Sequence, residues 1–149
     1  MKYLYYKNFL SMLDNAEGIK IFRHFYIQND NGGIIDILQD GNLSCATFVS
    51  SILYLNHLIS SQHTTVDSTI KDLLNSGWKL SSFDDLSKGD ILIWDEAEDQ
   101  ESKKLHKHIG FYIDKKTALS NDYRYQCIRK HKINFMERKI IQCFKYENI

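Results

Sequence analysis

The hydrophobic pattern of this chain changes at Gly89, and this change constrains the fold more than any other feature of the sequence. Before it, apolar residues recur at three- and four-residue spacing over residues 44–60 and 66–76, which is typical of helices. After it, short runs rich in β-branched and aromatic residues alternate with turn-prone or charged loops. Helices followed by a series of strands indicate the α+β class with an antiparallel sheet. The predicted strands cover residues 90–95, 108–113, 118–121, about 125–128 and 139–146.

Further elements are expected before the central helix of residues 44–60. An amphipathic helix over residues 8–18 is followed by a strand-like stretch over residues 19–27. The Asn-Asp-Asn-Gly-Gly run at residues 29–33 tolerates positive φ angles and therefore predicts a hairpin turn. This turn would join residues 22–28 to residues 34–38.

Length and composition predict one domain over residues 1–149, because 43% hydrophobic residues are enough to bury about two thirds of the unfolded surface. Nineteen Lys and Arg residues balance nineteen Asp and Glu residues, so we expect no nucleic-acid partner. No apolar run approaches the roughly 20 residues of a membrane span. The first residues lack the pattern of a secretory signal, and we therefore expect synthesis in the cytoplasm.

The three cysteines are too few and odd in number for a disulfide framework, so at least one free thiol is expected. Cys45 stands at the start of the central helix, where the helix N-terminus would lower the pKa of its thiol. Taken alone, a Cys on the apolar side of a helix is more often a small buried hydrophobe. Cys127 and Cys143 lie in strand patterns and are expected to be packing thiols.

Three motifs occur in order within residues 40–122: residues 44–49 (Ser-Cys-Ala-Thr-Phe-Val), residues 89–91 (Gly-Asp-Ile) and residues 108–113 (His-Ile-Gly-Phe-Tyr-Ile). In order and spacing they resemble the NlpC-type and CHAP-type branches of the papain-like fold. The resemblance implies N-terminal helices whose nucleophile helix packs on an antiparallel sheet. It also implies a cysteine peptidase or amidase, often acting on bacterial peptidoglycan. One departure is Ser44, where the NlpC-type branch usually has Asp, so substrate preferences transfer poorly.

Physical chemistry agrees with this resemblance. A Cys45 thiolate would attack a carbonyl carbon, while His108 would form an ion pair with the thiolate and protonate the leaving amine. Water would then hydrolyse the acyl-enzyme. A third polar group should orient the imidazole ring. The candidates for this group are Ser120, Asn121 and Asp122.

Hairpin geometry distinguishes these three candidates. If residues 115–116 are the centre of a two-residue turn, Gly110 pairs with Asn121. Asn121 would then lie on the same face of the sheet as His108, and we predict that it is the third catalytic residue. A three-residue loop would reverse this parity and favour the neighbours of Asn121.

The oxyanion formed during attack needs hydrogen-bond donors, and the first is the backbone N–H of Cys45. Asn42 and Gln39 lie in the preceding loop and are near enough in sequence to supply a second donor, although turn and capping duties also explain them. Ser44 is a further oxyanion or cleft candidate. Trp94 is expected in the cleft wall because its strand leads towards His108.

No metal or other cofactor is expected. His106 and His108 resemble an alternate-residue metal pair, but no further pattern completes a four-ligand site. The acidic run at residues 95–101 is interpreted as a solvated loop. His63 is interpreted as a surface or capping residue.

The expected substrate is a peptide or a peptidoglycan fragment, as the resemblance implies. A phage product released at lysis, an injected antibacterial effector and a cytoplasmic recycling enzyme each fit the sequence. Two other functions stay open. The same fold can serve as a non-catalytic binding or immunity domain, and the same Cys and His can catalyse acyl transfer or deamidation.

Overall fold

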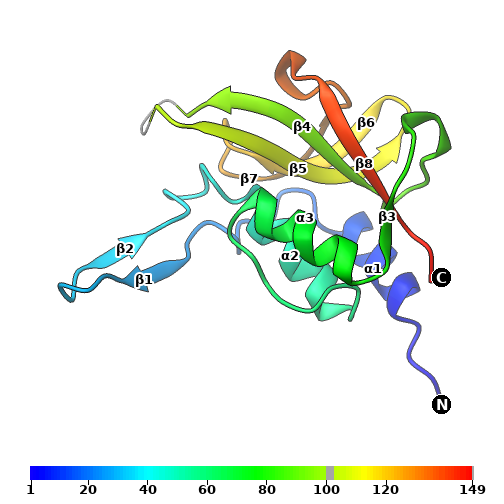
Figure 1. Cartoon of the computed structure of the whole chain (residues 1–149), viewed down its shortest axis with the longest axis horizontal. Helices are drawn as coiled ribbons and strands as arrows, with labels where there is room; N and C mark the ends of the chain where they lie inside the picture. Colours follow the sequence, from blue (N-terminus) through cyan, green and yellow to red (C-terminus); the bar gives the residue numbers. More distant parts are fainter. Residues whose placement is uncertain (100–102, 149) are drawn as a thin grey trace.

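The computed structural model describes residues 1–99 and 103–148, and in this part of the chain helices cover one face of an antiparallel sheet (Figure 1). The arrangement confirms the predicted α+β class. The helices are α1 (Tyr5–Asp14), α2 (Cys45–Leu55) and α3 (Val66–Asn75), with short 3-10 turns η1 (Phe83–Asp85) and η2 (Phe135–Glu137). The six strands are, in spatial order, β3 (Trp78–Leu80), β8 (Ile140–Tyr146), β4 (Ile91–Glu98), β5 (Leu105–Asp114), β6 (Thr117–Asp122) and β7 (Cys127–Lys132).

Both faces of this sheet are covered. Along β4, Ile91 and Ile93 join the apolar cluster under the helices, whereas Leu92 and Trp94 join a second cluster on the opposite face. Phe135 in η2 covers that opposite face and is 1% exposed. Buried strands of this kind read as continuous apolar runs, which explains the unbroken sequence of residues 91–94.

The helix predictions are confirmed in position but not in every boundary. The third helix, α3, matches its predicted range to within one residue. The helix α2 begins at Cys45 but ends at Leu55 instead of residue 60. It ends there because His57 adopts a left-handed φ of 56° and the N–H of Leu58 bonds back to the carbonyl of Leu53.

The N-terminal predictions are partly wrong. The helix α1 runs over Tyr5–Asp14, and most of the expected strand at residues 19–27 is irregular. The hairpin itself is confirmed, but its strands β1 (Tyr26–Gln28) and β2 (Ile34–Asp36) have three residues each. It extends away from the rest of the molecule in Figure 1, so no packed surface supports longer strands.

The acidic run at residues 95–101 was interpreted as a solvated loop, but much of it is a β-strand. Residues up to Glu98 continue β4, where Ala97 pairs with His106 after a register shift that follows Trp94. Residues 100 and 101, the last two of the predicted loop, lie outside the described residues. None of the described helices is long and apolar enough to cross a membrane.

Candidate active site

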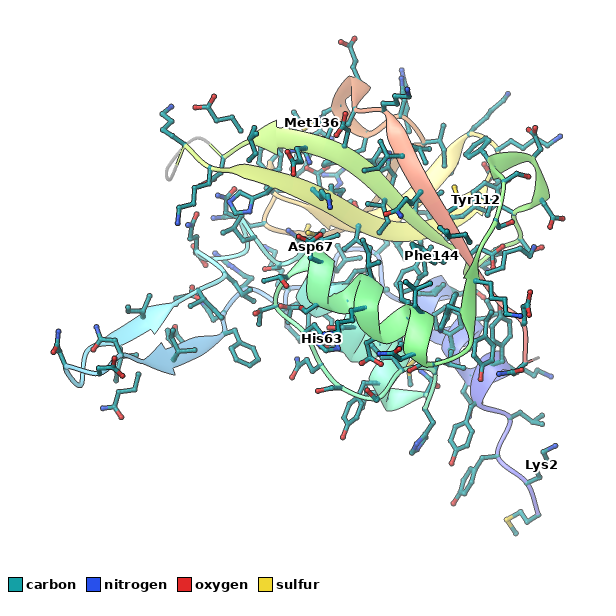
Figure 2. All side chains as sticks on the ribbon, in the orientation of Figure 1. Lys2, His63, Asp67, Tyr112, Met136 and Phe144 are labelled. Atoms are coloured by element: carbon teal, nitrogen blue, oxygen red, sulfur yellow. The ribbon has the colours of Figure 1, made fainter. Side chains whose placement is uncertain are left out.

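A cavity of about 730 Å³ opens where the N-terminus of α2 meets β5. Its walls come from the loop before α2, the start of α3, strands β4 to β6, and the segment that follows β7. Asp67 at the start of α3 and Met136 in η2 are two labelled side chains on different walls (Figure 2). The lining residues that matter for chemistry are Gln39, Asn42, Cys45, His108, Asn121 and Arg138.

Cys45 lies in the first turn of α2, as predicted, where it is the first helical residue, and it is partly exposed. The loop before it is held by Asp36, whose carboxylate accepts backbone N–H groups of Phe25, Leu38 and Asp40 at 2.9–3.1 Å. Gly41 supplies a turn in this loop with a φ of 88°. The helix N-terminus is therefore delivered to the cavity by a loop that backbone hydrogen bonds fix.

The expected low pKa of Cys45 is wrong. Burial raises the pKa of this thiol, and this effect outweighs backbone hydrogen bonds from Ile109 and Ala46 and the positive charge of Arg138, which all favour the thiolate. The helix N-terminus contributes less than desolvation. The resting protein therefore holds a neutral thiol at Cys45.

His108 lies in β5 and is 5% exposed. Its ring stacks on Phe135 with a centroid distance of 4.3 Å, and Trp94 contacts it at 5.2 Å. Burial, the charge of Arg138 and the neighbouring His131 together lower the pKa of His108 well below its ordinary value. The imidazole is therefore neutral at pH 7.

Trp94 is a packing residue, not the cleft-wall residue that was predicted. It is fully buried, and its indole N–H donates to the carbonyl of Ile133 at 2.8 Å. Its ring supports His108 from inside the second apolar cluster instead of lining the cavity.

The parity argument for Asn121 is wrong, although its turn is correct. Asp114 pairs with Thr117 across the two-residue turn. A register shift between Tyr112 and Asp114 then moves all pairs farther from the turn by one residue. Ser120 instead of Asn121 therefore lies beside His108. The hydroxyl oxygen of Ser120 is 2.8 Å from Nε2 of the His108 ring.

Asn121 and Asp122 have other partners. Asn121 donates its side-chain amide to the carbonyl of Gly41 at 2.7 Å, so it holds the loop before Cys45 while also lining the cavity. Asp122 forms an ion pair with Arg124. Gly110 has no side chain because a Cβ there would lie 2.7 Å from the Cβ of Ser120.

The candidates for a second oxyanion donor differ in their hydrogen-bond partners and in their position relative to the cavity. Asn42 donates to Oε1 of Gln39 at 3.0 Å and to a carboxylate oxygen of Asp99 at 2.9 Å, which uses both N–H groups of its amide. Ser44 is fully buried, and its hydroxyl has no hydrogen-bond partner within the described residues. Gln39 lines the cavity with its Oε1 held by Asn42, which makes its amide the better-placed second donor.

Three residues near the site were missed by sequence reasoning: His131, Phe135 and Arg138. The strand containing His131 was expected to end at residue 128, but β7 continues to Lys132. Extending the alternating pattern of this strand would have placed His131 beside β6. Neither Phe135 nor Arg138 carries a local signal, because both approach His108 from the segment around η2.

No group of three or more His, Cys, Asp or Glu side chains suitable for a metal ion occurs within the described residues. Nε2 of His63 lies 2.6 Å from a carboxylate oxygen of the buried Asp72, and this contact anchors the loop that contains His63. All three cysteines are free. Cys143 is buried, and burial raises its pKa to about 11.

Neither a family model nor a curated protein matches this chain. Among solved structures, the chain is similar to NlpC2 from Trichomonas vaginalis, with a TM-score of 0.56 and 16% sequence identity. The match covers 98% of this chain and 48% of the other, so the chain spans about half the length of that protein. This likeness shows that the chain has an NlpC-like fold, as the sequence motifs predicted.

Proposed function

We propose that this NlpC-like domain is a cysteine hydrolase that cleaves amide bonds with Cys45 as nucleophile and His108 as base. The observation that carries the proposal is the shared cavity, in which a thiol at a helix N-terminus and an imidazole held by Ser120 line the same space. A nucleophile, a base and a group that orients the base are the parts that covalent acyl transfer requires.

The resting pair is neutral, and this determines the order of proton transfers. Nδ1 of neutral His108 would take the thiol proton as Cys45 attacks the carbonyl carbon of the substrate. The imidazolium would then protonate the leaving amine as the carbon–nitrogen bond breaks. Water would next attack the acyl-enzyme, giving a proton to His108. The carbon–sulfur bond would then break to release the acid, and His108 would return the proton to the Cys45 sulfur, which restores the neutral pair.

No hydrogen bond joins the Cys45 sulfur to His108 among the described residues. Catalytic hydrogen bonds are often long in structures without substrate and shorten only in the complex. Displacement of water by a bound peptide would favour this contact. The charge of Arg138, which partly opposes the effect of burial on the pKa of Cys45, would stabilise the developing thiolate.

The oxyanion would be stabilised by the backbone N–H of Cys45 and the side-chain amide of Gln39. Asn42 would act indirectly, since it holds Oε1 of Gln39. Removing one such donor from an acyl-transfer enzyme typically lowers kcat by about 100- to 1000-fold.

The proposed substrate is a peptide or a peptidoglycan stem peptide. The cavity wall carries both acidic and basic side chains, which suits a charged peptide better than an apolar ligand. The acidic ones are Asp67, Glu96, Glu98 and Asp99, and the basic ones are Lys107 and Arg138.

The test is incubation of the purified protein with peptidoglycan and with isolated stem peptides, followed by mass spectrometry of the products. Wild-type protein should release a fragment with a new amine, and Cys45→Ala should release none. The matched controls are Cys127→Ser and Cys143→Ser, which should retain activity because neither residue lines the cavity. Failure of folded wild-type protein to cleave any stem peptide would contradict the proposal.

The alternative is a non-catalytic binding domain, which the missing thiol–imidazole hydrogen bond would favour. Such a cleft would be expected to be filled by aromatic side chains, but Tyr123 is the one Phe, Tyr or Trp residue on the described cavity wall. The same experiment separates the two functions. A binding domain would retain a stem peptide without cleaving it, with equal affinity in wild-type protein and Cys45→Ala.

A further inference from the structure

Two histidines on strands β5 and β7 are joined through one hydroxyl group on β6. Nε2 of His108 lies 2.8 Å from the Ser120 oxygen, and the same oxygen lies 2.6 Å from Nε2 of His131. The chain ends at the backbone, because Nδ1 of His131 is 2.8 Å from the carbonyl oxygen of Lys132. Four polar groups therefore form one continuous series of hydrogen bonds.

Both histidine rings of this series pack against aromatic rings. Phe135 lies 4.3 Å from the His108 ring and 4.4 Å from the His131 ring, measured between centroids. Trp94 contacts the same two rings at 5.2 and 5.8 Å. Burial is the main cause that lowers the pKa of each histidine, so both imidazoles are neutral at pH 7.

The carbonyl at the end of the series determines where each proton lies. A carbonyl oxygen only accepts, so Nδ1 of His131 carries a proton and Nε2 of this neutral ring is an acceptor. Ser120 must then donate its single hydroxyl proton to His131. Its oxygen can only accept from His108, so Nε2 of His108 carries the proton and Nδ1 has a free lone pair.

We infer that His131 is a positioning residue that acts through Ser120 to hold His108 in the tautomer with the proton on Nε2. This tautomer leaves Nδ1 able to accept a proton, which is what a general base needs. The inferred tautomer depends on the hydrogen bonds above and on both rings being neutral. Its consequence for catalysis rests on the proposed function.

Without His131, the hydroxyl of Ser120 can rotate and donate its proton to Nε2 of His108. That contact would stabilise the other tautomer, in which Nδ1 is protonated and cannot act as a base. Ser120→Ala would also remove the preference, because it removes the acceptor for the proton on Nε2. The two substitutions should therefore have the same effect, and combining them should add little.

The decisive measurement is two-bond ¹H–¹⁵N NMR of ¹⁵N-histidine-labelled full-length protein at pH 8, where the two neutral tautomers give different nitrogen shifts. In wild-type protein, His108 should be protonated at Nε2 and His131 at Nδ1. His131→Ala and Ser120→Ala should each shift His108 towards an average of the tautomers. His131→Gln, which offers an amide oxygen as acceptor, should restore the wild-type tautomer.

The matched control is His57→Ala, which removes an exposed histidine at the end of α2 and should leave the His108 signals unchanged. A wild-type His108 protonated at Nδ1 would overturn the inference. So would an unchanged tautomer in the folded Ser120→Ala protein, which serves as the test if His131→Ala does not fold.

Kinetics separate this inference from the proposed function. If the protein cleaves a stem peptide, His131→Ala should lower kcat on the order of tenfold with little change in KM, and His131→Gln should recover most of the loss. A protein with the expected tautomers but no hydrolysis would contradict the proposed function alone. Hydrolysis with normal kcat in folded His131→Ala would contradict the positioning role alone.

Discussion

Cys45 and His108 line the same cavity, but the two sides of this site are held by different kinds of interaction. On the nucleophile side, backbone groups of the loop before α2 bond to Asp36 and Asn121. On the base side, the ring of His108 is packed between Phe135 and Trp94 and forms a hydrogen bond with the side chain of Ser120.

This difference shows what determines the position of each reactive group and the charge state of His108. The position of Cys45 depends on backbone conformation, which short polar motifs specify locally. The position and charge state of His108 depend on burial among side chains that are distant in sequence. Substitutions should therefore affect the base side mainly through packing and the nucleophile side mainly through hydrogen bonding.

The largest effect is expected from Phe135→Ala, which would remove the ring that stacks on His108. Truncation of a buried Phe typically lowers the free energy of unfolding by about 3–5 kcal/mol. Water entering the space would also raise the pKa of His108 towards its ordinary value, since burial is the main cause of its low pKa. Chemical denaturation and an NMR titration of His108 measure the two effects.

Phe83→Ala is the matched control, because Phe83 is 38% exposed and contacts Tyr112 instead of a histidine. Its loss should cost much less stability and leave the pKa of His108 unchanged. Equal losses for the two substitutions would show that stacking on His108 contributes little to the base side.

An intermediate effect is expected from Gly110→Ala, which tests the contact between β5 and β6. The new Cβ would lie 2.7 Å from the Cβ of Ser120 and 2.8 Å from the backbone oxygen of Leu119, so the strands would have to separate. Overpacking of this kind costs about 1–3 kcal/mol. The hydrogen bond between His108 and Ser120 should lengthen, which the tautomer measurement would detect.

Gly33→Ala is the comparison for this substitution. The Cβ at Gly33 would meet only the side chain of Asn29, which can move aside in the exposed hairpin. Its effect on stability should be small. A loss of stability as large as that of Gly110→Ala would mean that the close approach of β5 and β6 is not the cause.

The sequence predicted the nucleophile side better than the base side, for a physical reason. Helix periodicity and the polar loop before it indicate that α2 begins at Cys45, and both signals are local. The partner of His108 depends on strand parity, and the register shift near Ile113 reverses that parity without any local marker. For this reason Asn121 was predicted as the partner of His108, whereas the structure places Ser120 there.

The charge states were predicted less well than the positions. A helix N-terminus lowers the pKa of a thiol, but the opposing effect of burial is larger at Cys45. Burial depends on how α2 packs on β5, which a sequence pattern does not specify. Arg138 was missed for the same reason, because its nearness to His108 follows from the path of the chain after β7. His131 was missed because β7 continues past residue 128, where the predicted strand ended.

The smallest effect is expected from Asp36→Asn on the nucleophile side. Burial raises the pKa of Asp36, but hydrogen bonds from His24 and from three backbone N–H groups outweigh it and hold the pKa well below its ordinary value. Folding therefore favours the ionised carboxylate, whose stabilising effect is present above about pH 4 and is lost as the pH falls further. An amide has one acceptor oxygen in place of two, so Asp36→Asn should lose about 1 kcal/mol of stability at pH 7.

Below about pH 3, where the wild-type carboxylate loses this advantage, the difference in stability between the two proteins should shrink. Denaturation curves from pH 2 to pH 7 measure it, with exposed Asp30→Asn as the control, and a constant difference across this range would exclude ionic anchoring of the loop before Cys45.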